Sequence, residues 1–157
     1  MLRPIGVIRT PFDSSEGVPI QSSKSEAMGE ALIYEEFSPG LDSLNSFSHA
    51  ILIYWFHRST GTRLLLTPYL DSRKRGVFST RAPSRPNPIG LSVVEIREVR
   101  PDRVVFRGAD MLNNSPLLDI KPFVPEFDNR PEASSGWLEK PLRDNGQLFA
   151  ADDRFQA

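Results

Sequence analysis

The stretch LSVVEIREVRPDRVVFRGA, residues 91–109, decides the fold, because two runs rich in β-branched residues flank a short Arg-Pro-Asp connection. Runs of this kind are typical of β-strands separated by a turn. We therefore predict strands at 91–99 and 103–109. The same character predicts further strands at residues 2–10, 30–34, 50–56, 76–80 and 117–123.

Helical periodicity is weak throughout the chain. A single turn is predicted within residues 43–48, and a short helix within 133–140 behind Pro131. Many short strands, Gly and Pro between them, and too little helix to cover a parallel sheet predict a mainly all-β protein, an antiparallel β-barrel or sandwich with few short helices. Closure into a barrel would also leave no exposed strand edge.

The length of 157 residues and the 39% hydrophobic content allow one domain with a real core. We assign residues 1–127 to that domain. From residue 128 to 157 the sequence is acidic, contains Pro and Ser, and has scattered aromatic residues. We predict that this part is an extended C-terminal arm, packed on a partner or on the barrel, and not an independent domain.

Charge and cysteine content exclude several classes of protein. The net charge of −1 gives no global attraction to nucleic acid, so any such attraction must come from a local patch. The absence of cysteine excludes disulfides, zinc-thiolate sites and thiol nucleophiles. The longest apolar run, residues 50–56, is far too short for a membrane span, and the N-terminus lacks a signal-peptide stretch. We expect a soluble, cytoplasmic protein.

Residues 72–91, SRKRGVFSTRAPSRPNPIGL, form the strongest local patch, with five basic side chains and no carboxylate. The prolines at 83, 86 and 88 exclude helix from residue 82 onward and stiffen the chain. One interpretation is a Pro-rich surface connection with solvated charges. The other is a rigid loop that grips an anionic partner, such as the phosphates of a nucleic acid, with its cationic side chains: Arg73, Lys74, Arg75, Arg81 and Arg85.

The common catalytic signatures are missing: the sequence has no G-x-G-x-x-G after a strand, no Walker A pattern, no H-E-x-x-H and no G-x-S-x-G. The two histidines, His49 and His57, lie at opposite ends of the predicted strand 50–56, about 26 Å apart along a straight strand, so they cannot share a metal ion. Each is either a strand-end histidine bonded to a nearby carbonyl or part of a site. His57 is the favoured site residue because Arg58 follows it.

Strand alternation in residues 115–125 places Leu118 and Ile120 on one face, and Asp119 and Lys121 on the other. On the inner face of a barrel mouth the charged pair would be functional. On the outer face it would be an ordinary surface pair worth under about 1 kcal/mol. The sequence leaves both possibilities open.

Four segments together resemble, in order and spacing, the TsaA-like family of TrmO tRNA methyltransferases: PIGVIRTPF (4–12), LDSLNSFSHAILIYWFH (41–57), GVFSTRAPSRPNPIGLS (76–92) and LLDIKPFVP (117–125). The resemblance covers residues 4–127. It implies a single-sheeted β-barrel that works as a homodimer and uses S-adenosyl-L-methionine to methylate N6 of threonylcarbamoyladenosine at position 37, in the anticodon loop of tRNA. Longer members of the family carry an additional C-terminal domain, so this chain is similar to the short form.

By position, the resemblance assigns cofactor binding to Pro19, Ile20, Gln21, His57, Arg58, Arg81, Leu91, Asn113, Asn114, Ser115 and Pro116. Two places depart from the family pattern. Ile20 stands where arginine is usual, which removes a cation and its fork of donors, and Asn113-Asn114 replaces Asp-Gly, which removes a carboxylate and an easy positive-φ residue.

Direct methyl transfer from a sulfonium requires no metal, so the task of the protein is to place the reacting atoms about 3–3.5 Å apart. The carbamoyl group withdraws electrons from the acceptor N6, so a base or polar group is expected beside it. Asp119 is our candidate for the base and Asn87 for an orienting group. Two alternatives stay open: a cofactor-binding barrel with a different or lost methyl acceptor, and a non-enzymatic adaptor that holds an anionic partner.

Overall fold

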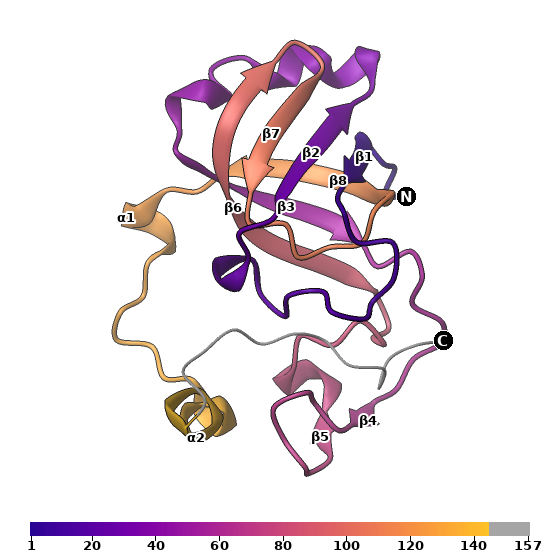
Figure 1. Cartoon of the computed structure of the whole chain (residues 1–157), viewed down its shortest axis with the longest axis vertical. Coiled ribbons are helices and arrows are strands. Elements are labelled where there is room, and N and C mark those ends of the chain that lie inside the picture. Colours follow the sequence, from indigo (N-terminus) through magenta and orange to yellow (C-terminus); the bar gives the residue numbers. More distant parts are fainter. Residues whose placement is uncertain (145–157) are drawn as a thin grey trace.

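The computed structural model describes residues 1–144 of the 157-residue chain. Six strands close into an antiparallel barrel in the order β1-β2-β7-β6-β3-β8 (Figure 1). The strands are β1 (Gly6–Arg9), β2 (Met28–Ile33), β3 (His49–Trp55), β6 (Ile89–Arg100), β7 (Arg103–Arg107) and β8 (Ser115–Pro122). The predicted all-β barrel is confirmed. The predicted strands at 2–10, 30–34, 50–56, 91–99, 103–109 and 117–123 all contribute to it.

Alternate side chains along each strand point into the barrel and form its core. In β3, for example, Ala50, Leu52 and Tyr54 are buried, and the residues between them face outward. Side chains from every strand meet in one core, among them Ile8, Ala31, Ile33, Leu52, Val94, Val104, Phe106 and Leu117. One contiguous apolar interior therefore supports the whole sheet and fixes which residues remain outside.

Short 3₁₀ helices lie between the strands: η1 (Ser22–Lys24), η2 (Glu35–Leu41), η3 (Leu44–Ser46) and η4 (Val77–Ser79); η5 (Gly136–Leu138) follows the last strand. The last residue of η2 and the first of η3, Leu41 and Leu44, are buried in the barrel core. The turn predicted within 43–48 is η3. The helix predicted within 133–140 is present as η5 followed by α2 (Glu139–Asp144).

The predicted strand at 76–80 is wrong. A separate two-stranded sheet of β4 (Leu65–Leu66) and β5 (Arg75–Gly76) ends there, and η4 follows at once. The Val77 N–H still donates to the Leu64 carbonyl at 2.9 Å, but the Thr80 N–H turns back to the Val77 carbonyl at 3.1 Å. Because β4 supplies only two residues for pairing, the chain closes a turn instead of extending a ladder.

A bulge in β8 changes the predicted alternation. Tyr54 pairs with Leu117 and Ile53 pairs with Asp119, so Leu118 is an extra residue between them. Leu117 is fully buried and Ile120 packs against the core. The alternation predicted for Leu118 therefore fails at the bulge. Asp119 and Lys121 do share the outer face, where their side chains form an ion pair of 2.9 Å.

The C-terminal arm leaves the barrel through α1 (Pro125–Asp128) and runs past the loop that contains η4 (Figure 1). The Trp137 indole N–H donates to the Ser79 carbonyl at 2.8 Å, and the Arg75 guanidinium lies over the Trp137 ring at 5.2 Å. The described part of the arm therefore contacts the basic loop of its own chain. The rest of the predicted arm, residues 145–157, lies outside the described residues. No helix within residues 1–144 is long and apolar enough to cross a membrane.

Candidate functional site

The basic loop is stiffened by its own arginine. A single nitrogen of Arg85, Nη1, donates to the carbonyls of Thr80 at 3.0 Å, Ala82 at 3.3 Å and Val77 at 3.4 Å. These bonds tie together three residues, Val77, Thr80 and Ala82, just before a segment whose prolines allow no regular ladder. The half-buried Arg85 therefore helps to shape the loop, in addition to the phosphate-binding role predicted for it.

Cations of the loop differ in their surroundings. Arg75 is paired with Asp71, which lies one residue before the carboxylate-free stretch, at 2.6 Å. Hydrogen bonding to Arg75 lowers the pKa of Asp71. Arg73 and Lys74 are exposed at the tip between β4 and β5. Of the cations predicted to bind nucleic acid, these two offer the most accessible charge.

Arg81 joins two of the predicted cofactor segments. Its Nη1 donates to the Gln21 side-chain oxygen at 2.6 Å, across sixty positions of sequence. Gln21 is the N-cap of η1, and η1 is held to β6 because the Ser22 hydroxyl donates to the Val93 carbonyl at 2.7 Å. The Pro19-Ile20-Gln21 turn and the loop arginine therefore meet beside the start of β6, where Leu91 is exposed.

The predicted cofactor residue Leu91 follows a close contact between β3 and β6. Gly90 pairs with Tyr54, and a Cβ built on Gly90 would lie 2.4 Å from the Tyr54 ring. Only glycine admits the ring at this position. The Pro88 carbonyl also accepts the Phe56 N–H at 2.8 Å. The P-N-P-I-G segment is therefore fixed on the end of β3, directly before His57.

His57 carries an open ring nitrogen. Its Nδ1 is buried and has no hydrogen-bond partner among the described residues. Burial, followed by the neighbouring Arg58 charge, lowers the pKa of His57, so its imidazole is neutral at pH 7. The Trp55 carbonyl opposes this lowering, and a buried ring nitrogen without a well-formed hydrogen bond keeps the capacity to bond a ligand group.

The Asn113-Asn114-Ser115-Pro116 turn adopts the shape that the family's Asp-Gly would allow. Asn114 has a φ of 65°, a left-handed conformation that Asn tolerates better than most residues. The Arg9 guanidinium donates to the Asn114 side-chain oxygen, and Asn113 Nδ2 donates to the Asp13 carboxylate at 3.0 Å. The Asn113-Asn114 pair therefore forms a turn with one left-handed residue and no carboxylate.

The Phe12-Asp13 segment connects this turn with the His57-Arg58 pair. Asn113 N–H donates to the Phe12 carbonyl at 2.7 Å, and Arg58 Nη1 donates to the Asp13 carbonyl at 2.5 Å. Ser115 contributes no free hydroxyl, because its Oγ donates to the Leu112 carbonyl at 2.7 Å and the residue is buried. The contacts thus form two groups: Gln21 with Arg81, and Arg58 with the 113–116 turn.

The predicted catalytic residues lie on the surface. Asp119 pairs with Lys121, and its Oδ1 accepts its neighbour's Ile120 N–H at 2.9 Å. Asn87 is exposed, and its carbonyl accepts the Ile89 N–H at 2.8 Å. Within residues 1–144 no hydrogen bond or ion pair joins either residue to Arg81 or His57, so their catalytic roles stay predictions.

Sequence reasoning missed one ionisable group, Asp110. Its carboxyl accepts the Ser92 hydroxyl at 2.5 Å, and burial raises its pKa to about 7. The sequence carries one signal for it: Asp110 is the single carboxylate between residues 103 and 118. Within residues 1–144 no three His, Asp or Glu side chains are grouped as metal ligands.

Residues 7–129 match the family of the tRNA-methyltransferase O N-terminal domain. The chain belongs to this family. It is 48% identical over 155 residues to a probable S-adenosyl-L-methionine-binding protein of Pyrococcus abyssi, covering 94% of this chain and 84% of the relative. It is 43% identical over 128 residues to an S-adenosyl-L-methionine-binding protein of Archaeoglobus fulgidus, covering 82% of this chain and 92% of the relative.

Relatives with a named reaction are more distant. The human tRNA (adenine(37)-N6)-methyltransferase is 32% identical over 137 residues, covering 82% of this chain but 31% of the human protein. The crystal structure of TrmO from Pseudomonas aeruginosa superposes with a TM-score of 0.74 at 34% identity, covering 87% of this chain and 62% of that one. This chain therefore spans less than two thirds of the length of these two family members.

Proposed function

We propose that this protein binds S-adenosyl-L-methionine and methylates N6 of threonylcarbamoyladenosine at position 37 of tRNA. The observation that carries the proposal is the contact of Arg81 with Gln21. It joins two predicted cofactor segments in a chain whose family includes tRNA adenine-N6 methyltransferases. Fold alone would not support an activity, because one fold hosts many functions.

The described residues fit the cofactor at two points. The neutral His57 ring has an unpartnered buried Nδ1 that can exchange a hydrogen bond with a polar group of the ligand. The left-handed Asn114 keeps the turn that the family pattern requires. Ile20 is half-buried and supplies apolar contact where arginine is usual. The chain therefore retains the backbone of the site with fewer charges.

When bound, S-adenosyl-L-methionine supplies an electrophilic methyl group on a sulfonium. The protein's part is placement, for which the Arg85-braced loop and the fixed P-N-P-I-G segment provide a rigid wall. We retain Asp119 as the group that removes the N6 proton and Asn87 as an orienting group. Both are on surfaces that a large RNA can reach. Asp119→Asn with full turnover and bound cofactor would eliminate the first role.

For the tRNA, we propose that Arg73 and Lys74 contact phosphates of the anticodon stem-loop, with Arg75 and Arg85 adding field strength from more restrained positions. Two cations on a protein of net charge −1 predict weak binding by one protomer. We therefore propose a homodimer, which would double the positive surface. Sedimentation with and without an anticodon stem-loop tests this arrangement.

A second candidate function is cofactor binding with a different or lost methyl acceptor. It is favoured by the names of the archaeal relatives, which state S-adenosyl-L-methionine binding and no reaction. The departures at Ile20 and at Asn113-Asn114 point the same way, since they change the charge of the cofactor segments.

Calorimetry and a methyl-transfer assay separate these functions. We expect saturable binding of S-adenosyl-L-methionine, and transfer of radioactive methyl to tRNA that carries threonylcarbamoyladenosine. The control is the same tRNA without that modification, which should take up no label. Binding without transfer would support the second candidate. The absence of both heat and a thermal shift at saturating cofactor would contradict both.

A further inference from the structure

The Asp110 carboxyl lies at the meeting point of three chain segments. Asp110 belongs to the loop between β7 and β8, and its carboxyl accepts the Ser92 hydroxyl of β6 at 2.5 Å, while the Ser22 backbone N–H of η1 favours the charged form of the same carboxyl. The residue is half-buried, and its carboxyl group is enclosed by these donors. Residues 22, 92 and 110 are far apart in sequence. The Asp110 side chain therefore lies between η1 and β6, two elements that are not neighbours along the chain.

Both neighbouring segments are anchored independently. The Ser25 hydroxyl donates to the Ala109 carbonyl at 2.6 Å, which holds the end of η1 against the residue before Asp110. On the other side, the Tyr54 and Ser92 hydroxyls lie 3.1 Å apart, forming a buried chain of three polar groups that ends at Asp110. A polar network of this kind specifies one arrangement when its members are satisfied.

The segments that Asp110 joins are those of the proposed cofactor site. Gln21 directly precedes Ser22, Leu91 directly precedes Ser92, and the Arg81 charge acts on the Asp110 carboxyl while Arg81 Nη1 holds Gln21. We call Gln21, Ser22, Arg81, Leu91 and Ser92 the rim. Ser22 and Ser92 act on the Asp110 carboxyl directly, and Arg81 acts on it through its charge. Gln21 and Leu91 are the chain neighbours of the two serines.

We propose that Asp110 is a positioning residue: its carboxyl holds the two serines of the rim by hydrogen bonds and so fixes where Gln21, Arg81 and Leu91 lie. The identity of what the rim binds rests on the proposed function. Asp110 itself acts through these neighbours and needs no contact with the methyl group or its acceptor.

This arrangement should be sensitive to pH. The groups that act on Asp110 are the Tyr54 hydroxyl of β3, the Ser92 hydroxyl of β6, the Ser22 N–H of η1 and the Arg81 guanidinium. Burial raises the pKa of Asp110 to about 7, with Ser92, Ser22 and Arg81 opposing that rise. A state in which the rim opens and water reaches Asp110 would restore an ordinary carboxyl pKa near 3.9. Between about pH 4 and 7, rising pH therefore favours the open rim, and above pH 7 the effect levels off.

Hydrogen exchange on the cofactor-free protein tests the proposal. Corrected for intrinsic rates, protection of the Ser22 amide should fall by up to about tenfold per pH unit from pH 5 to 7 in the wild type. Asp110→Asn keeps an acceptor for Ser22 and a donor for Ser92, so its protection should not change with pH. Asp110→Ala should lose protection at every pH. Asp102→Asn, an exposed Asp on the turn between β6 and β7, is the matched control and should follow the wild type.

Cofactor affinity provides the second readout. At pH 7 we expect Asp110→Ala to weaken S-adenosyl-L-methionine binding by about tenfold, and Asp110→Asn to stay within about threefold of the wild type. Equal losses in both variants would overturn positioning by hydrogen bonds, as would wild-type protection of Ser22 in Asp110→Ala. If the wild type binds no cofactor, the proposed function fails, and the exchange measurements still decide the role of Asp110. Circular dichroism confirms folding, and Asp110→Asn keeps the test valid if Asp110→Ala does not fold.

Discussion

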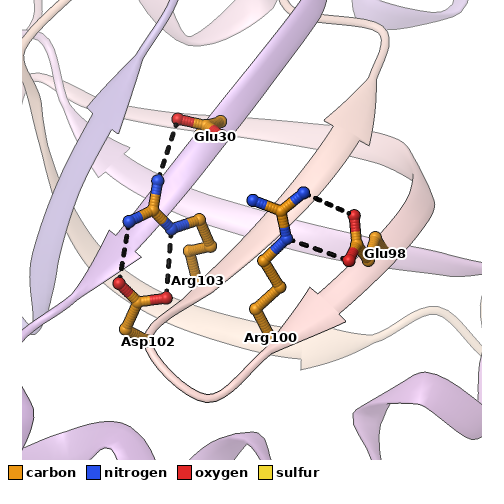
Figure 2. A network of polar contacts seen from close by, with 5 residues as sticks. All are labelled: Glu30, Glu98, Arg100, Asp102 and Arg103. Atoms are coloured by element: carbon orange, nitrogen blue, oxygen red, sulfur yellow. Dashed lines mark hydrogen bonds and ion pairs between the residues drawn. The ribbon is translucent and has the colours of Figure 1, made fainter.

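The charged side chains at the two ends of β6 have different kinds of partner. At its C-terminal end, the hairpin to β7 carries a cluster of charged residues that pair with one another: Glu30, Glu98, Arg100, Asp102 and Arg103, shown in Figure 2. We call this the hairpin cluster. At the N-terminal end of β6, the rim charges are held by neutral groups: Arg81 by an amide oxygen, and Asp110 by a hydroxyl and a backbone N–H.

This difference shows which charges are available to a ligand. Each guanidinium of the hairpin cluster already has a carboxylate at about its own level of exposure, such as Arg100 with Glu98 at 2.9 Å. The pKa of Glu98 is lowered by its bond to Arg100, and that of Arg103 is raised by Asp102. In the rim, burial raises the pKa of Asp110 instead, so its charge is incompletely compensated. A partly buried charge without an opposite charge to pair with is a functional signal, and a paired surface charge is not.

The largest effect is expected from adding one carbon atom at Gly90, the residue directly before Leu91 of the rim. Gly90→Ala would place its Cβ 2.4 Å from the Tyr54 ring, which the closed barrel holds in place. We expect a loss of about 3 kcal/mol in the free energy of unfolding, at the upper end for overpacked cores, together with weaker cofactor binding. Denaturant titration measures the first and calorimetry the second. Gly76→Ala is the control, because a Cβ there meets nothing within 4 Å. Equal stability of the two variants would contradict the close contact.

The second effect concerns how the free energy of unfolding depends on pH, which should have opposite sign for the charged groups at the two ends of β6. Because the pKa of Asp110 is raised, between about pH 4 and 7 the folded protein holds a proton on this carboxyl that the unfolded chain has lost. Over this range, the free energy of unfolding of the wild type should therefore fall with rising pH, relative to that of Asp110→Asn. The difference should approach about 1.4 kcal/mol per pH unit, giving about 2 kcal/mol between pH 5 and 7.

Asp102 in the hairpin cluster predicts the opposite trend. Hydrogen bonding to Arg103 lowers the pKa of Asp102 in the folded protein. Asp102 therefore adds to the free energy of unfolding above its unfolded-state pKa, and this contribution is lost as the pH falls through its folded-state pKa, below about pH 4. Urea titrations of the wild type, Asp110→Asn and Asp102→Asn across pH 3 to 8 check both trends. A wild-type curve that runs parallel to that of Asp110→Asn between pH 5 and 7 would show that Asp110 is not enclosed.

The barrel was predictable from sequence because alternation and turn residues report directly on strands. The strands at 91–99 and 103–109 were predicted from their β-branched and aromatic residues and from the turn residues between them, and both pair around the β6–β7 turn. Two features were not predictable. Residues 76–80 have strand composition, but β4 has only two residues, and of these only Leu65 pairs with a residue in this range, Gly76. The phase of β8 changes at Leu118, because a bulge depends on the partner strand and not on local composition.

The site was predictable in its parts but not in its connections. Gln21, Arg81 and the 113–116 turn were located by resemblance, and the contact of Gln21 with Arg81 depends on how η1 docks on β6. Asp110 was missed because its character comes from burial and from Ser22 and Ser92, which lie far away in sequence. The same limitation applies to the basic loop, where the partner of Arg75 lies just outside the carboxylate-free stretch.

The third effect compares an arginine of the rim with one of the hairpin cluster. Arg81→Gln should weaken S-adenosyl-L-methionine binding by about 10- to 30-fold, because it removes a charge-assisted hydrogen bond that orients Gln21. Arg100→Gln removes a guanidinium that is also exposed, at the other end of the strand, and should leave the affinity unchanged. Calorimetry at one salt concentration compares the two. Similar losses in both variants would indicate a general charge effect.

A smaller effect is expected from the accessible cations at the tip of the basic loop. Replacing both Arg73 and Lys74 by Ala should weaken binding of an anticodon stem-loop and reduce the slope of log K against log salt by about 1.4. Cofactor affinity should not change, since neither residue belongs to the rim. Arg97→Ala is the control, because Arg97 is exposed on β6 and paired with Glu95. An unchanged salt slope would contradict a role for the tip in RNA binding.

The smallest effect is expected within the hairpin cluster itself. Glu98→Gln removes the carboxylate that holds Arg100 by two hydrogen bonds of 2.9 Å, but both side chains are about half exposed and water can replace the lost contact. The denaturation midpoint, cofactor affinity and salt slope should all stay within experimental scatter of the wild type at moderate ionic strength. A clear loss of stability would mean that the cluster acts as a cooperative network through Glu30 and Arg103. In that case the two ends of β6 would differ in how deeply their charged groups are buried. Whether those groups pair with charged or with neutral partners would not distinguish the two ends.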